Sequence, residues 1–187
     1  MAVILQQTLL IGLCVSMSLE RKDEKLGELN KLASGSSSNI LVGKGLFYFL
    51  VYLIFSQFFV TVVFSVFDMP FRGSFWEVNF LMAVFFVSLI PMAFLIGSFF
   101  KNTLLIIQLM GFSSYPIFLI TGYSMPFENL PLAIQWISNL LPTTPFLRIY
   151  TLVVQGGGSI IDQLPNLFHL VGLGVFYTLL FIFKMKY

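Results

Sequence analysis

The sequence contains very little charge, and this scarcity limits the class of protein. Only 10% of its 187 residues are Asp, Glu, Lys or Arg, whereas 58% are hydrophobic and 17% are aromatic. A soluble domain carries about 25% charged residues. The apolar residues also form long uninterrupted blocks, which argues against burial in one water-soluble core. The composition therefore predicts an integral membrane protein, and the net charge of +2 gives no indication of nucleic-acid binding.

Cysteine and histidine are almost absent, which excludes several kinds of chemistry. A single cysteine, Cys14, cannot form an intrachain disulfide, and with one distant histidine, His169, it offers neither a zinc site nor a nucleophile–base pair. The chain has no G-x-x-x-x-G-K-[ST] phosphate loop. No two carboxylates fall within apolar blocks, which excludes an intramembrane aspartyl protease and a typical proton relay. We therefore predict no catalytic, cofactor-binding or metal-binding residues, and a protein that is not an enzyme.

Five apolar segments are long enough to cross a bilayer, since a spanning helix needs roughly 17–25 residues. A charged residue at a helix centre costs about 2.5–3.5 kcal/mol on insertion, and the interiors of these segments contain none. We predict a single all-α, polytopic membrane domain with spans at about residues 2–19, 45–67, 78–100, 103–122 and 166–183.

The charged residues are concentrated in the segment between the first two spans, residues 20–44. Leu19–Lys44 holds nine of the eighteen charged residues. Its first half also has an apolar stripe at helical spacing, formed by Leu19, Leu26, Leu29, Leu32 and Ala33. This pattern predicts an amphipathic helix, which either offers its apolar face to the membrane or to another protein, or is a solvated surface helix.

The distribution of Lys and Arg predicts the orientation. With five spans, eight of the ten basic residues fall on one side of the membrane, and only Arg72 and Arg148 fall on the other. Basic loops stay in the cytoplasm. We therefore expect segment 20–44 and the C-terminus in the cytoplasm, the N-terminus outside, and a multi-pass location in the cell inner (plasma) membrane.

The segment 123–165 is apolar but is broken by prolines into pieces too short to span. Pieces 132–141 and 146–155 favour two short helices, arranged as an outer re-entrant hairpin that needs protein cover for its backbone. An ordinary extracellular loop is the alternative, although such a loop is seldom this apolar.

Uncharged polar residues within the spans allow two interpretations. Interhelical hydrogen bonds, worth about 0.6 kcal/mol each, are the simpler one. The other is a polar transport path, for which the candidates are Gln57, Thr61, Gln108, Ser113 and Ser114.

Three stretches, taken in order, carry a resemblance to a known family. They are the charged run 20–25 with Gly27-Glu28-Leu29 and Gly43-Lys44, the turn 97–102 between the third and fourth spans, and the segment 122–131 before the short helices. The order resembles the type-2 permease subunit of ATP-binding-cassette (ABC) exporters. The resemblance implies a homodimer or paired permease in membrane lipid, working with an ABC ATPase subunit in trans. It also implies that ATPase coupling uses Glu20, Arg21, Glu24, Leu26, Gly27, Glu28 and Leu29.

Such permeases usually have six spans, both ends in the cytoplasm, and often a large external domain after the first span. We therefore expect this chain to be a permease lacking the first span and that domain; a natural five-span protein is the alternative. The alternative function is a non-transporting membrane anchor or assembly subunit, which recruits a cytoplasmic partner through its charged helix. The sequence does not indicate the substrate.

Overall fold

The computed structural model describes residues 2–22, 37–67, 72–122 and 127–186, and the regular structure in these ranges is helical. Five of its helices are long and apolar enough to cross a membrane, which confirms the predicted all-α polytopic fold. They are α1 (Ala2–Lys22), α3 (Ser37–Phe58, continued by the π-helix η1, Phe59–Val63, and α4, Phe64–Val66), α5 (Phe75–Gly97), α6 (Thr103–Ile120) and α9 (Leu164–Lys186). Most of the predicted amphipathic helix, at residues 23–33, lies outside the described ranges.

The second spanning helix begins earlier than the hydropathy of the sequence indicates. It starts at Ser37 rather than Gly45, so that Lys44 lies inside the helix. The charge is tolerated there because the Lys44 ammonium forms an ion pair with Glu20 of α1. Similarly, α5 starts at Phe75, with Glu77 in its first turn, where a carboxylate interacts favourably with the helix dipole.

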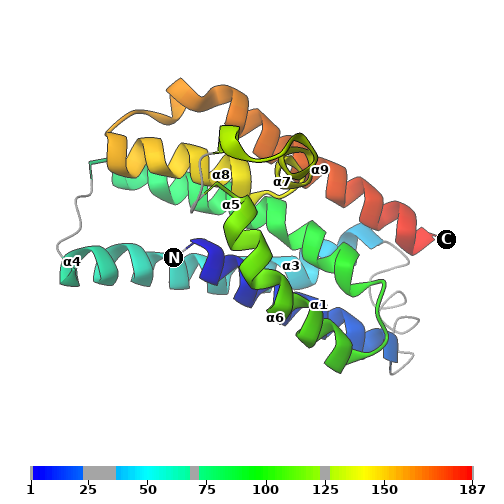
Figure 1. Ribbon diagram of the computed structural model, residues 1–187. Coiled ribbons are helices and arrows are strands. Elements are labelled where there is room, and N and C mark those ends of the chain that lie inside the picture. The colour runs from blue at the N-terminus through cyan, green and yellow to red at the C-terminus, as the bar shows by residue number, and fades with distance from the viewer. Residues whose placement is uncertain (1, 23–36, 68–71, 123–126, 187) are drawn as a thin grey trace.

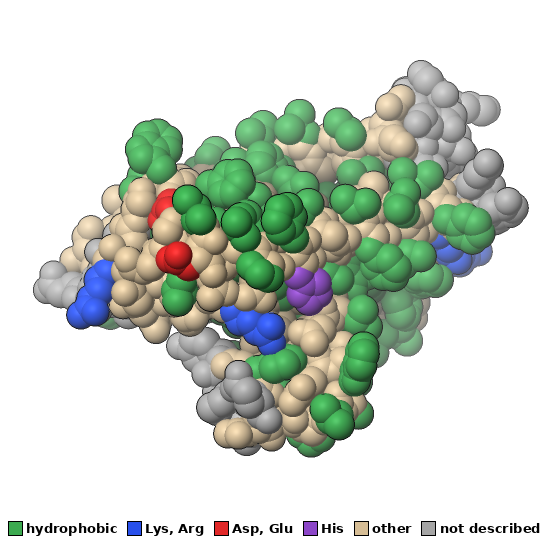
Figure 2. All heavy atoms as spheres, turned by 90° about the horizontal axis from the view of Figure 1, so that it is seen from above, with side chains coloured by type: hydrophobic (Ala, Val, Ile, Leu, Met, Phe, Trp, Pro, Cys, Tyr) green, Lys and Arg blue, Asp and Glu red, His purple; other side chains and the backbone are tan. Residues whose placement is uncertain are grey.

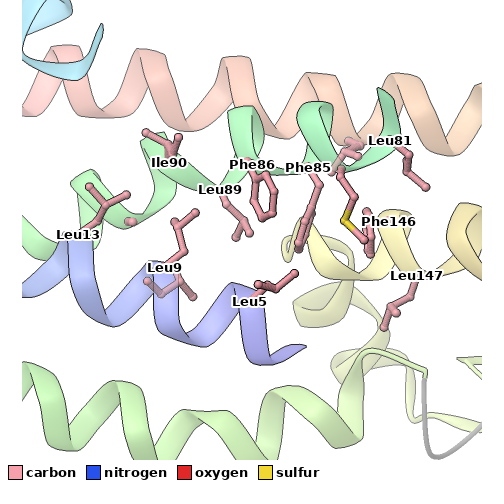
Figure 3. Packing of buried hydrophobic residues seen from close by; sticks show 14 of the residues in the cluster. Leu5, Leu9, Leu13, Leu81, Phe85, Phe86, Leu89, Ile90, Phe146 and Leu147 are labelled. Carbon is pink, nitrogen blue, oxygen red and sulfur yellow. The ribbon is translucent and has the colours of Figure 1, made fainter. Parts of the chain in front are cut away.

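Helix α5 lies at the centre of the bundle, with α1 and α3 packed against it from one direction and α9 from another (Figure 1). Most of its side chains from Leu81 to Gly97 are buried, whereas Trp76 and Phe80 near its start are exposed. Figure 3 shows Leu5 and Leu9 of α1 pointing toward Phe85 and Leu89 of α5. A helix that is apolar on all sides is expected in such a central position.

Small residues allow the helices to pack closely around α5. A Cβ atom added at Gly97 would lie 2.9 Å from the Met17 Cβ atom and 3.0 Å from the Cys14 Cα atom, both on α1. On α9, a Cβ atom at Gly174 would lie 3.0 Å from the Ser88 Oγ atom and 3.1 Å from its Cα atom. The same Ser88 hydroxyl donates a hydrogen bond to the Leu170 carbonyl at 2.9 Å. Close backbone approach of this kind is typical of helix pairs in membranes.

The segment after α6 forms two short helices, of which the second packs into the bundle. They are α7 (Leu132–Asn139) and α8 (Thr143–Tyr150), and α8 continues into the π-helix η3 (Thr151–Gly156). The second helix starts at Thr143 rather than the predicted Phe146, because Pro145 lies in its first turn, where a missing N–H costs little. Phe146 is fully buried and stacks on Phe85 of α5, with ring centroids 4.1 Å apart. In this α7–α8 pair, here called the hairpin, α8 has the protein cover that a re-entrant segment requires, whereas α7 leaves Leu132 and Trp136 74% and 76% exposed.

The bundle has two distinct ends. The end of α1, the start of α3, the α5–α6 turn with Lys101 and the end of α9 lie together at what we call the basic end (Figure 1). At the opposite, hairpin end, the 3-10 helix η4 (Ile160–Gln163) leads into α9. Figure 2 shows many hydrophobic side chains and few charged ones over the face it presents. Such a surface is suited to lipid or to another apolar chain.

Candidate functional site

At the basic end, α1 and α3 are joined by a charged contact. The Lys44 ammonium donates hydrogen bonds to the Glu20 carboxylate and to the Ser16 hydroxyl, the latter at 2.9 Å. The two charged side chains are only 25% and 19% exposed, respectively. Partial burial reduces solvent screening, so this pair is stronger than a fully exposed one. It holds the last turn of α1 against α3.

Two further contacts join α1 to the turn between α5 and α6. The Arg21 guanidinium donates to the Ser98 carbonyl, and the Ser18 and Thr103 hydroxyls lie 3.4 Å apart. On the other side of this turn, the Lys184 ammonium of α9 lies 4.4 Å from the centroid of the Phe99 ring, which is a cation–π distance. The basic end is therefore a network that connects α1, α3, the α5–α6 turn and α9.

The network fixes both ends of the charged segment that was predicted to couple to an ATPase. Glu20 and Arg21 are engaged within the chain, with Lys44 and with the Ser98 carbonyl. The other predicted coupling residues lie outside the described ranges: Glu24, Leu26, Gly27, Glu28 and Leu29. The coupling role of all seven residues stays a prediction.

The candidate path residues fall into two groups that a single chain does not bring together. Gln57 is half-buried on α3, which packs mainly against α5, and Thr61 is exposed on η1, the continuation of α3. Gln108, Ser113 and Ser114 lie on α6, which packs mainly against α1. The Ser113 hydroxyl donates to the Met110 carbonyl of its own helix at 2.8 Å. The transport-path role of these five residues stays a prediction.

The structure reveals a polar cluster at the tip of the hairpin that was not predicted from the sequence. The Thr143 hydroxyl donates to the side-chain carbonyl of Gln6 on α1. The Ser138 hydroxyl donates to the Ile120 carbonyl, the last residue of α6, at 2.7 Å, and the Thr144 hydroxyl donates to the Ser138 carbonyl at 2.7 Å. All four polar side chains are fully buried. This hairpin-tip cluster (Gln6, Ser138, Thr143 and Thr144) ties the hairpin to α1 and α6.

The cluster has a simple physical purpose, and a sequence signal for it existed. A chain reversal inside an apolar bundle leaves backbone groups unpaired, and each must find a partner. The Leu140 carbonyl in this reversal accepts a hydrogen bond from the Tyr177 hydroxyl of α9 at 2.8 Å. The signal was the pair of glutamines in the first span, because polar residues are expensive in a membrane and usually have a specific partner.

The two glutamines retain unused hydrogen-bonding capacity. Within the described ranges, the amide nitrogen of Gln6 and both amide atoms of Gln7 are buried without a protein partner. Polar atoms of this kind normally bind ordered water or a ligand when the protein offers none.

A pocket of about 640 Å³ opens at the hairpin end between α6, α8, η3 and α9. Its lining is largely polar and includes one basic residue, Arg148. The Arg148 guanidinium lies 4.1 Å above the centroid of the Phe127 ring and donates to the Asn166 side-chain carbonyl at 3.5 Å. This volume is within the usual range of small-molecule sites.

No group of three or more His, Cys, Asp or Glu residues in the described part of the chain is arranged to hold a metal ion. Cys14 is fully buried, and its thiol donates to the Ala93 carbonyl at 3.2 Å. Its environment is therefore that of a small packing residue.

A family model described as ABC-2 family transporter protein matches residues 1–183. Neither the curated proteins nor the solved structures contain a match to the chain.

Proposed function

The chain belongs to the ABC-2 transporter family, and we propose that it is the permease of an exporter whose ATP is hydrolysed by a separate subunit. The observation that carries the proposal is the family match over residues 1–183, together with five helices long and apolar enough to cross a membrane. The chain also has no phosphate loop of the Walker type, so an ATP-driven permease of this kind needs a partner that binds ATP.

We propose that the basic end faces the cytoplasm of a cell whose inner (plasma) membrane the chain spans. Lys44, Lys101 and Lys184 all belong to this end, whereas Arg72 and Arg148 belong to the hairpin end. Cytoplasmic loops carry the excess of Lys and Arg. In this orientation segment 20–44 is accessible to a cytoplasmic ATPase.

Coupling in this proposal runs through the basic-end network. A partner that moves segment 20–44 pulls on its two ends, Glu20 and Lys44, which are paired to each other. The movement then reaches the α5–α6 turn through the contact between Arg21 and the Ser98 carbonyl. Because α5 is the central helix, displacement of its end changes its packing against α1, α3 and α9.

The transport path in this proposal requires two paired permeases. The candidate path residues lie on α3, η1 and α6, and both sets of helices leave large hydrophobic side chains exposed, such as Ile54 and Phe112. A second copy or a paired permease packs on these faces. The polar groups of the two chains then meet at one interface. Lipid covers the remaining apolar surface.

The test is co-expression with a candidate ABC ATPase subunit, followed by affinity purification and measurement of ATPase activity in liposomes. Glu28→Lys with Leu29→Asp reverses a charge and breaks the apolar stripe of the predicted helix. We expect this variant to insert normally in the membrane but to lose co-purification of the ATPase. Partly buried charge pairs at interfaces cost about 2–5 kcal/mol when one partner is lost, which is enough to abolish capture.

Ser34→Lys with Ser36→Asp is the matched control, because it adds charges to the same segment beyond the predicted helix. We expect it to co-purify as the parent does. Equal capture of the ATPase by both variants contradicts the coupling role of the helix. A different result is that the parent chain captures the ATPase while the ATPase activity in liposomes equals that of the ATPase subunit alone. That result favours the alternative function, a membrane anchor that only recruits its partner.

A further inference from the structure

We propose that the pocket at the hairpin end is a binding site for a phosphate-type anion, with Arg148 as its principal ligand. The inference concerns binding alone and does not depend on the proposed transport function. It rests on the position of one cation, on the absence of a described carboxylate to neutralise it, and on the polar side chains around it.

The guanidinium of Arg148 is held in place but retains free donors. Its face lies against the Phe127 ring at 4.1 Å, and one of its nitrogens donates a long hydrogen bond, 3.5 Å, to Asn166. A guanidinium has five N–H donors in a planar fork, so most of them stay available at its edge. A fixed fork loses little conformational freedom on binding, and it matches the oxygens of a phosphate in bidentate geometry.

The charge of Arg148 has no described acidic partner. Within the described ranges the only ion pair is that of Lys44 with Glu20, at the opposite end of the bundle. Two described carboxylates at the hairpin end, Glu77 and Asp162, accept hydrogen bonds from Ser159, at 2.8 and 3.0 Å, and neither lines the pocket. The pocket thus carries a net positive charge from its described lining residues, which attracts anions.

The neighbouring side chains favour a hydrated or polar anion over an apolar ligand. Gln155 and Gln163 add amide donors to the lining, and Thr121 and Thr151 add hydroxyls. The volume of about 640 Å³ accommodates a phosphate with a small polar substituent, such as glycerol. Two sources can present this chemistry: the headgroup of an anionic phospholipid and a soluble phosphate ester.

The test uses the full chain purified in detergent. Binding of short-chain phosphatidylglycerol is measured by native mass spectrometry, with the zwitterionic phosphatidylcholine of equal chain length as comparison. Binding of glycerol 3-phosphate is measured by thermophoresis. We expect Arg148→Gln to weaken binding of the anionic probe about tenfold or more, since hydrogen bonds to charged groups are among the stronger ones.

Two further variants test whether binding occurs in the pocket. One controls for a general loss of positive charge, and the other blocks the pocket while keeping Arg148. Arg72→Gln removes the same charge from the hairpin end, but Arg72 is exposed and does not line the pocket, so binding should stay within about twofold of the parent. Thr151→Trp keeps Arg148 and fills the pocket from an exposed position, so it should also weaken binding.

Each outcome decides the proposal. Loss of phosphatidylglycerol binding in Arg148→Gln and Thr151→Trp, with none in Arg72→Gln, supports a lipid headgroup as the ligand. The same pattern with glycerol 3-phosphate alone supports a soluble ester. Failure of both probes to bind the parent chain overturns the proposal, as does unchanged binding in Arg148→Gln and Thr151→Trp.

Discussion

Individual polar side chains at the hairpin tip illustrate how an apolar chain accommodates a reversal of direction. Gln6 and Thr143 are far apart in the sequence, are both fully buried, and form a hydrogen bond with each other. A hydrogen bond between neutral groups contributes only about 1 kcal/mol net, but leaving one partner unpaired costs more. Loss of one partner of this pair is therefore expected to destabilise the fold by more than the hydrogen bond itself stabilises it.

Thr143→Val is the substitution that tests this asymmetry. It keeps the shape of the side chain but leaves the Gln6 carbonyl oxygen buried without a partner, and we expect a loss of about 1–3 kcal/mol in folding free energy. The measurement is the apparent melting temperature of the purified chain in detergent. Thr178→Val is the matched control, because the Thr178 hydroxyl donates only to the Gly174 carbonyl of its own helix.

The double variant Gln6→Leu with Thr143→Val completes the cycle. Replacing both partners with apolar groups removes the orphaned atom, so the double variant should recover part of the loss. Equal melting temperatures for Thr143→Val and Thr178→Val would show that the bond with Gln6 is unimportant.

At the residue level, the sequence indicated which kinds of chemistry the chain can support better than it indicated which residues contact each other. The scarcity of Cys and His and the lack of a phosphate loop can be read directly from the sequence. The partners of Gln6, Glu20 and Arg21 do not, because each lies on an element distant in the sequence. Spacing along one helix indicates which residues share a face, but not which helix covers that face.

Among the elements, the pair α5 and α9 shows most clearly how the bundle is packed. Gly174 on α9 contacts the backbone of Ser88 on α5, whereas a Cβ atom added at Gly172, two residues earlier, would meet nothing within 4 Å. The two glycines thus share a helix and differ only in what they face. This difference provides an internal control for the role of close helix packing.

Gly174→Ala should destabilise the chain, because the added methyl group would lie 3.1 Å from the Ser88 Cα atom, which cannot move without shifting α5. Overpacking of this kind costs about 1–3 kcal/mol. Gly172→Ala should be neutral or slightly stabilising, because alanine favours a helix over glycine by about 0.8–1.0 kcal/mol. Thermal melting of the two variants in the same detergent measures the contrast, and a larger loss for Gly172→Ala would refute this packing.

The spanning helices were predictable because length and hydropathy determine them. The hairpin was harder. Prolines indicated two short helices, but the packing of α8 against α5 involves Phe146 stacking on Phe85, a contact between distant segments. The early start of α3 depends likewise on the pairing of Lys44 with Glu20. The observed starts of α3 and α8 therefore differ from the predicted ones because the sequence alone does not show how a charge or a proline is accommodated.

The orientation of the whole molecule can be tested with positions that the structure shows to be accessible. Lys101 at the basic end and Asn129 at the hairpin end are both exposed. Single cysteines at these positions are introduced into a Cys14→Ala background and labelled in intact cells with an impermeant maleimide. Because the basic end should stay in the cytoplasm, we expect labelling of Asn129→Cys and protection of Lys101→Cys.

Cell lysis provides the control for this experiment, since both cysteines should label once the membrane is opened. Labelling of Lys101→Cys in intact cells, with Asn129→Cys protected, would reverse the orientation and remove segment 20–44 from the reach of a cytoplasmic ATPase.

The ion pair between Glu20 and Lys44 also has a consequence for how a partner is bound. It fixes Glu20 and Lys44, the two ends of the charged segment, relative to each other. The entropy of bringing those ends together is lost when the chain folds and not when a partner arrives. For the partner that we propose to bind segment 20–44, this part of the ordering entropy is therefore already lost before binding.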